Sequence, residues 1–156
     1  MIPYGRQDIS EEDIKRVIET LNSDWVTQGP TVQKFEDEIQ RKIGCHFAVT
    51  ANSATSCLHL ACRALGLTNN QWVWTSPNSF VASANAALYC GAKVDFVDIN
   101  PFTYNICCQK LEEKLIEAKK NNLLPKIVTP VHYAGQSCEM EKIHKLSIKY
   151  NFKIIE

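Results

Sequence analysis

The sequence lacks several features that would point to particular classes of protein. It contains 17 Lys plus Arg and 17 Asp plus Glu, so no excess of basic residues favours nucleic acid or an anionic membrane as a partner. No apolar run approaches the length that spans a membrane, and the first residues lack the apolar core of a signal peptide. We therefore expect a cytoplasmic protein that binds neither nucleic acid nor membrane.

The signatures of disulfide, metal and common nucleotide sites are also missing. The seven cysteines include no C-x-x-C pair, and the adjacent Cys107 and Cys108 cannot form an ordinary disulfide. A reducing compartment fits this cysteine pattern. The four histidines lack metal-ligand spacing, so no metal site is expected. Neither G-x-x-x-x-G-K-[ST] nor G-x-G-x-x-G occurs, which disfavours a P-loop protein and an NAD-type enzyme.

Two amphipathic helices are expected in an N-terminal helical segment, residues 1–45. Ser10 is a suitable N-cap for the first helix, and Asp13 stands three residues later, as in a capping box. The apolar face of the second helix ends before Gly44, a favourable residue for a helix C-terminus. Residues 25–30, between the two helices, contain a Gly-Pro pair and are expected to form a loop.

From residue 46 onward, short apolar segments alternate with segments of helical periodicity. This alternation is typical of an α/β domain in which a mostly parallel sheet lies between layers of helices. Five strands are expected, over residues 47–51, 72–75, 93–97, 127–131 and 153–156. Helices are expected between them, over residues 53–65, 80–90, 109–121 and 139–150. We therefore predict a three-layer α/β domain over residues 46–156.

Small polar residues stand where the first expected strand runs into a helix, at residues 52–56. The first backbone N–H groups of a helix have no partner within the helix, and the positive end of the helix dipole lies behind them. A hydroxyl-rich strand-to-helix turn is therefore typical of a phosphate site. Ordinary helix capping uses the same residues, so both interpretations stay open at this point.

An aromatic residue, Phe80, follows the second expected strand. Ligands on a parallel sheet bind outside the carboxyl ends of the strands, so residues 52–56 and 76–80 should lie at the same edge. A phosphate site beside a flat ring indicates a flat phosphorylated cofactor such as pyridoxal phosphate (PLP). Phe80 as a core residue is the alternative. His132 follows another strand and is either an acid–base or ligand group at this edge or a structural histidine.

Motifs along the whole chain resemble those of the DegT/DnrJ-type sugar aminotransferases. The matching segments are residues 2–5, 23–30, 52–56, 74–77, 82–85, 89–92, 94–99 and 130–137. The resemblance implies the N-terminal part of the large domain of a fold-type I PLP-dependent transferase. Residues 74–77 and 89–99 are most similar to the branch that forms UDP-4-amino-4,6-dideoxy-N-acetyl-beta-L-altrosamine in pseudaminic acid biosynthesis.

The resemblance also implies a cofactor site and a substrate site. Ala54 and Thr55 would bind the PLP phosphate through backbone N–H groups and a hydroxyl, and the Phe80 ring would stack on the pyridine ring. Four further residues would border the sugar-nucleotide pocket, namely Trp25, Thr27, His132 and Tyr133. The implied substrates are a UDP-linked 4-keto-6-deoxy amino sugar and, as amino donor, glutamate. A second subunit completes this pocket in the family, so a homodimer is expected.

Two groups that perform the central chemistry in the family have no match in the sequence. One is an Asp that pairs with the pyridine nitrogen; its position directly follows the one matched by Glu156. The other is a lysine that bonds to the cofactor, and none of the thirteen lysines matches it. We therefore assign no catalytic residue and expect the 156-residue chain to be inactive alone. A non-catalytic module that binds a nucleotide sugar or phosphate, and a purely structural subunit, are the alternatives.

Overall fold

The computed structural model describes residues 5–156 of the chain. These residues form two compact units, and the boundary along the chain falls between Thr50 and Ala51. The first unit contains helices α1 (Glu11–Leu21) and α2 (Pro30–Ile43). The predicted capping box of α1 is confirmed, because the Asp13 N–H donates to Ser10 Oγ while the Ser10 N–H donates to the Asp13 carboxylate. Gly44 ends α2 in the left-handed conformation, at φ 75°. Neither helix buries a residue.

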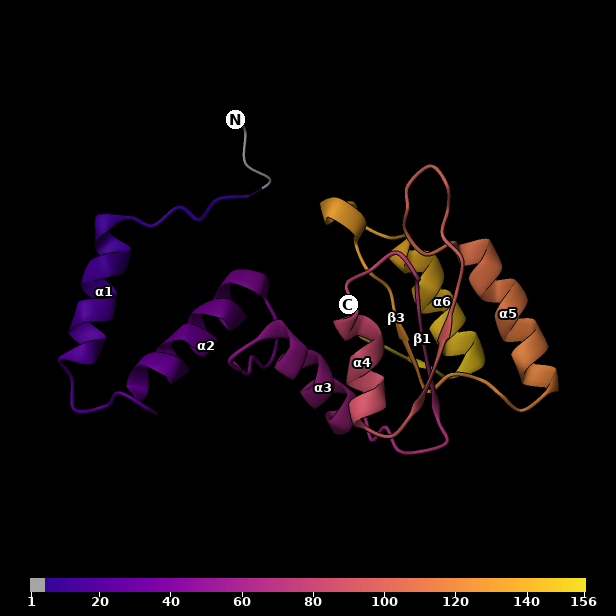
Figure 1. The fold of residues 1–156 in the computed structure, drawn as a ribbon, viewed down its shortest axis with the longest axis horizontal. Coiled ribbons are helices and arrows are strands. Elements are labelled where there is room, and N and C mark those ends of the chain that lie inside the picture. Colours follow the sequence, from indigo (N-terminus) through magenta and orange to yellow (C-terminus); the bar gives the residue numbers. More distant parts are fainter. Residues whose placement is uncertain (1–4) are drawn as a thin grey trace. The chain divides into compact units, whose positions relative to one another are not determined.

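The second unit, Ala51–Glu156, contains the sheet. Its elements in chain order are α3 (Ala54–Ala64), β1 (Trp72–Thr75), α4 (Ala82–Tyr89), β2 (Lys93–Phe96), α5 (Cys108–Lys120), β3 (Ile127–Thr129), the short 3₁₀ turn η1 (Tyr133–Gly135), α6 (Met140–Tyr150) and β4 (Lys153–Ile154) (Figure 1). The strands and helices of this unit follow the predicted alternation, with ends that differ from the expected ones by at most two residues, whereas the turn η1 was not predicted. The division into domains at residues 45 and 46, with the functions expected for each part, stays a prediction.

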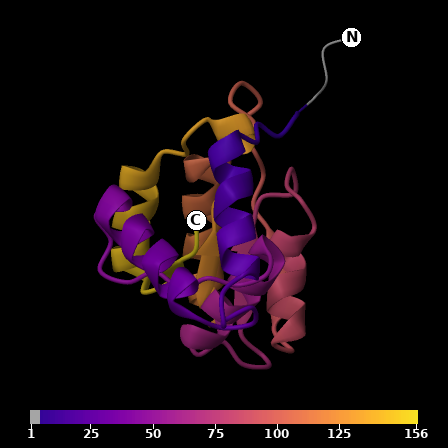
Figure 2. The same cartoon turned by 90° about the vertical axis from the view of Figure 1, so that its left-hand side faces the viewer.

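All four strands are parallel and lie in the order β2-β1-β3-β4. Helices α3 and α4 share one hydrophobic cluster with the sheet, and α5 and α6 share another. In Figure 2, α4 (pink) and α6 (yellow) lie on opposite sides of this unit, as the two clusters require. The unit is therefore the predicted three-layer α/β arrangement.

Alternating side chains of the central strands supply the two cores. Val73 and Ile127 pack toward α3 and α4, whereas their neighbours Trp74 and Val128 pack toward α5 and α6. This alternation is the two-residue period of a β-strand. Both sides of β1 and β3 are buried, as expected for strands in the middle of a parallel sheet.

The strand predicted over residues 47–51 is wrong. These residues have no regular structure, and the side chains of Phe47 and Val49 are 87% and 79% exposed. A strand needs the backbone of a neighbour for its hydrogen bonds, and no strand among residues 5–156 pairs with this segment. The Thr50 N–H and hydroxyl instead donate to Glu36 Oε1, over 2.8 and 2.9 Å. The sheet therefore has four strands in place of the five expected.

None of the helices within residues 5–156 combines the length and the apolar composition needed to cross a membrane. The longest, α2, has 14 residues and carries charged side chains along its length.

Candidate functional site

The carboxyl ends of β1, β3 and β4 lie side by side at one edge of the sheet. From β1 the chain crosses to β2 on one side, and from β3 it crosses to β4 on the other, so the direction of winding reverses between β1 and β3. Such a switch point opens a crevice at the carboxyl edge in doubly wound sheets. At this point the buried Thr75 hydroxyl donates to the Thr129 carbonyl over 2.8 Å and joins the ends of the two strands.

Helix α3 directs its first turn toward the same edge. Its last turn connects to the amino end of β1, so the helix runs antiparallel to the strand and Thr55 lies toward the carboxyl end. Ser53 caps the helix by accepting from the Ser56 N–H over 3.2 Å, and the Ser56 hydroxyl donates to Asn52 Oδ1 over 2.8 Å. The cap occupies Ser53, Ser56 and Asn52 but leaves Ala54 and Thr55 unused.

The N–H groups of Ala54 and Thr55 are therefore available at the start of α3. As the first two residues of the helix, they have no carbonyl partner within it. The half-buried Thr55 side chain adds a hydroxyl beside them. Two N–H groups, a hydroxyl and the positive end of a helix of 11 residues can together hold a phosphate dianion.

The segment after β1 contributes a buried hydroxyl and an exposed ring. Ser76 is 2% exposed, and its Oγ has no hydrogen-bond partner among the described residues. It lines a cavity of about 170 Å³ together with Ser79, Phe80 and Phe96. Phe80 lies just before α4 and is 76% exposed, so the alternative of a core phenylalanine is wrong. A buried hydroxyl without a partner and an exposed ring beside one cavity fit a flat ligand with polar substituents.

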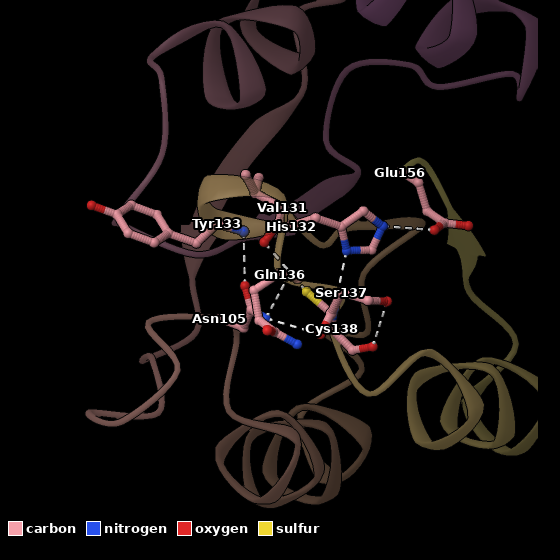
Figure 3. Close-up of polar contacts among 8 residues, drawn as sticks. All are labelled: Asn105, Val131, His132, Tyr133, Gln136, Ser137, Cys138 and Glu156. Carbon is pink, nitrogen blue, oxygen red and sulfur yellow. Dashed lines mark hydrogen bonds and ion pairs between the residues drawn. The ribbon is translucent and has the colours of Figure 1, made fainter. Parts of the chain in front are cut away.

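The segment after β3 places His132 between two fixed groups (Figure 3). Its Nδ1 accepts from the Cys138 N–H over 3.0 Å, and its Nε2 lies 2.9 Å from Glu156 Oε2. Glu156 follows β4, so this contact joins the carboxyl ends of two neighbouring strands. The Tyr133 ring is exposed and tilted against the ring of Tyr104, with 5.6 Å between their centroids.

Asn105, a residue that the sequence did not single out, holds the His132 segment in place. Its side chain is almost fully buried and hydrogen-bonds with the backbone of Tyr133, Gln136 and Ser137 (Figure 3). No local pattern marks this role, because the partners are about 30 residues away along the chain.

The two other predicted substrate residues lie in the first unit. Trp25 lies in the loop between α1 and α2. Its backbone N–H donates to Ser23 Oγ over 3.2 Å, and its side chain is exposed. A Cβ at Gly29 would come within 2.5 Å of the Trp25 Cβ, so a larger residue there would displace this loop. Thr27 is exposed in the same loop. Their contribution to a substrate pocket stays a prediction.

Other reactive groups are poorly suited to the chemistry of this edge. Burial raises the pKa of the Cys62 thiol to about 11 and that of the Cys108 thiol to about 12, so both are protonated near neutral pH. The described part of the chain contains no group of three or more His, Cys, Asp or Glu side chains arranged to hold a metal ion. The candidate site therefore consists of the α3 start and the segments after β1 and β3.

Comparison with known proteins supports a single family. The model of the DegT/DnrJ/EryC1/StrS aminotransferase family matches residues 7–156. The UDP-4-amino-4,6-dideoxy-N-acetyl-beta-L-altrosamine transaminase of Campylobacter jejuni is 41% identical over the entire chain. The spore coat polysaccharide biosynthesis protein SpsC of Bacillus subtilis is 38% identical over 99% of it. The chain spans only 40% and 38% of the lengths of these two relatives.

Solved structures agree with this result. The aminotransferase PseC of Helicobacter pylori, described as involved in the biosynthesis of pseudaminic acid, matches 97% of the chain at a TM-score of 0.87 and 34% identity. NtdA of Bacillus subtilis, solved with bound pyridoxamine phosphate, matches 95% of the chain at a TM-score of 0.81 and 28% identity. The chain covers 40% and 34% of those proteins. On the family match and these likenesses, the chain belongs to the DegT/DnrJ/EryC1/StrS aminotransferase family.

Proposed function

We propose that this chain is the N-terminal part of a PLP-dependent aminotransferase that acts on a UDP-linked 4-keto-6-deoxy amino sugar. Glutamate is the proposed amino donor, and pseudaminic acid biosynthesis is the proposed pathway. The observation that carries the proposal is the start of α3, where the Ala54 and Thr55 N–H groups and the Thr55 hydroxyl are available for a phosphate. The likeness to the transaminase of Campylobacter jejuni, which extends over all 156 residues, supports the same substrate class.

The side chains at the carboxyl edge fit PLP in shape and in polarity. The α3 start would take the phosphate, and the exposed Phe80 ring would stack on the pyridine ring. The buried Ser76 hydroxyl has no partner among residues 5–156 and would donate to a ring substituent. When bound, PLP supplies the electron sink and the carbonyl carbon through which an amino group passes between substrates.

In this proposal, the residues of this chain bind and orient the cofactor and the substrate. Residues outside these 156 would move the proton during amino transfer. Glu156 lies 2.9 Å from His132, so its carboxylate is already engaged and is a poor partner for a pyridine nitrogen. The lysines that stand in a strand or directly before one in the sequence are also on the wrong side: Lys93 and Lys153 begin β2 and β4, and Lys126 precedes β3. All three therefore belong to the amino edge of the sheet. We propose that the 156-residue chain does not transaminate alone.

The substrate pocket is proposed to include His132 and Tyr133, with Trp25 and Thr27 as further contacts. His132 and Tyr133 follow β3, at the edge to which the α3 start also points. We propose that the protein forms a homodimer with a shared active site, as its likeness to the family implies. A cytoplasmic location is proposed because the cysteine pattern fits a reducing compartment.

A hybrid protein tests the proposed function. Residues 1–156 would replace the matching segment of the Campylobacter jejuni transaminase, and the purified hybrid would be assayed with PLP, glutamate and a UDP-4-keto-6-deoxy amino sugar. We expect PLP-dependent formation of the 4-amino sugar, and no product from the 156-residue chain alone. A folded hybrid that binds PLP without turnover would favour the non-catalytic binding module. Turnover by the isolated chain would show that it carries a catalytic lysine.

A further inference from the structure

The loop between β3 and α6 adopts a conformation that needs support. Its backbone turns through the left-handed region at Ala134, with φ 50°, and at Gly135, with φ 83°. Glycine tolerates this region, but a residue with a Cβ atom, such as Ala134, is disfavoured there. Contacts from outside the loop must therefore hold it in this shape, because its own sequence does not favour it.

Asn105 supplies those contacts from the segment that follows β2. Its Nδ2 donates to the carbonyls of Gln136, over 2.9 Å, and Ser137, over 3.1 Å, while its Oδ1 accepts from the Tyr133 N–H over 2.8 Å (Figure 3). The residue is 4% exposed, so water competes little for these bonds. Only an amide side chain offers two donors and an acceptor in this arrangement, since aspartate lacks the donors.

The loop held by Asn105 ends at a contact that fixes the histidine. The Cys138 N–H, one residue beyond Ser137, donates to His132 Nδ1 over 3.0 Å. A backbone N–H can only donate, so this ring nitrogen is the acceptor and carries no proton. In the neutral ring the proton is then on Nε2, which faces Glu156 Oε2 at 2.9 Å. The Cys138 thiol also donates to the Val131 carbonyl over 3.3 Å and closes the loop at its base.

We propose that Asn105 is a positioning residue that holds His132 in the Nε2–H form at the carboxyl edge of the sheet. In this form His132 donates a hydrogen bond, to Glu156 or to an acceptor of the substrate, and does not accept a proton through Nε2. A role in binding the sugar nucleotide rests on the function proposed above, whereas the protonation of the ring does not.

Nitrogen NMR of the full 156-residue chain, labelled with ¹⁵N-histidine, tests this proposal. Long-range ¹H–¹⁵N correlations report which ring nitrogen carries the proton, and a His132→Gln variant assigns the signal among the four histidines. We expect the Nε2–H form in the wild-type chain. Asn105→Ala, which removes all three bonds to the loop, should give an averaged mixture of the two neutral forms. Asn105→Asp, which keeps only the Oδ1 acceptor, should do the same.

Asn121→Ala is the matched control, because Asn121 is an exposed asparagine at the end of α5 and its side chain, within the described part of the chain, bonds only to the nearby Glu117 carbonyl. It should leave the His132 signal unchanged. An Nδ1–H form in the wild type, or an unchanged signal in folded Asn105→Ala, would overturn the proposal. If the Asn105 variants do not fold, amide hydrogen exchange in the wild type decides. Slow exchange of the Tyr133 and Cys138 N–H groups supports their hydrogen bonds to Asn105 and His132, and fast exchange refutes the proposal. None of these signals requires PLP or sugar, so failure of the proposed function is detected separately.

Discussion

At the scale of single residues, Thr55 distinguishes a phosphate site from a helix cap. Ser53 already caps α3, so the Thr55 hydroxyl is not needed for the cap. In the hybrid protein, Thr55→Val should remove a charge-assisted hydrogen bond to the PLP phosphate, worth about 1.5–3 kcal/mol. The affinity for PLP, measured by equilibrium dialysis, should fall roughly tenfold to a hundredfold.

The matched control for this substitution is Thr68→Val. Thr68 is an exposed threonine in the segment before β1, at the opposite end of that strand. Its substitution should leave the affinity for PLP unchanged. If Thr55→Val also leaves it unchanged, Thr55 has no part in cofactor binding.

The residues that the sequence reveals are those whose function depends on local spacing. The small polar residues before α3 could be predicted as a phosphate site even though the strand expected before them does not form, because the first turn of any helix leaves backbone N–H groups without partners. The roles of Ser76 and Asn105 could not be predicted. The burial of the Ser76 hydroxyl and the hydrogen bonds of Asn105 to residues about 30 positions away both depend on tertiary contacts. His132 was predicted as a candidate from its place after a strand, but its bonds to Cys138 and Glu156 were not.

At the scale of elements, the start of α1 should respond to acid. The hydrogen bond from the Ser10 N–H holds the pKa of Asp13 below its ordinary value of 3.8, and the Ser10 hydroxyl adds to this effect. A carboxyl whose pKa is lowered by folding stabilises the folded form above the unfolded pKa, and this contribution is lost as the pH falls through the folded pKa. The α1 helix should therefore loosen below about pH 3.8.

Carbon NMR shifts of α1 followed against pH would measure this effect. Asp13→Asn should reduce the acid-dependent change in the first turn, and Asp8→Asn, in the exposed segment before the helix, should preserve it. An identical response in both variants would mean that the capping box does not link α1 to pH.

Most elements of the second unit could be predicted because their side chains follow a clear period. The strand at residues 72–75 was predicted with its observed ends, and the helices of this unit within two residues. The strand at residues 47–51 was predicted from its alternating apolar residues, but alternation does not supply a neighbour. Its failure shows that local sequence indicates the preference of a segment, whereas pairing decides whether a strand forms.

The core between the sheet and α5 can be tested with two residues of that helix. Leu111 is fully buried, whereas Ile116 is 45% exposed. Leu111→Ala should lower the free energy of unfolding by about 2–5 kcal/mol, because it leaves a cavity in the core. Ile116→Ala should change it by about 0.5 kcal/mol or less. Urea denaturation followed by circular dichroism measures both, and equal losses would contradict the assigned faces of α5.

At the scale of the whole molecule, many large apolar side chains of the described residues are exposed. They are spread over α1, α2 and the segment before α3, and include Ile14, Val17, Ile18, Leu21, Val32, Phe35, Ile43, Phe47 and Val49. Exposed apolar surface is typical of sites that contact other protein segments, so we expect such contacts on these two helices and the segment before α3. The relatives are more than twice as long as this chain, which is why the tests of cofactor binding use the hybrid protein.

Amide hydrogen exchange of the hybrid protein, with and without PLP, tests the central claim most directly. If the start of α3 binds the phosphate and Phe80 covers the ring, PLP should slow exchange at residues 54–57 and 76–81. Pyridoxal, which has the ring without the phosphate, should lose the protection at residues 54–57. If PLP binds by dialysis but exchange at residues 54–57 stays unchanged, the phosphate lies elsewhere and the proposed site at the carboxyl edge of the sheet is wrong.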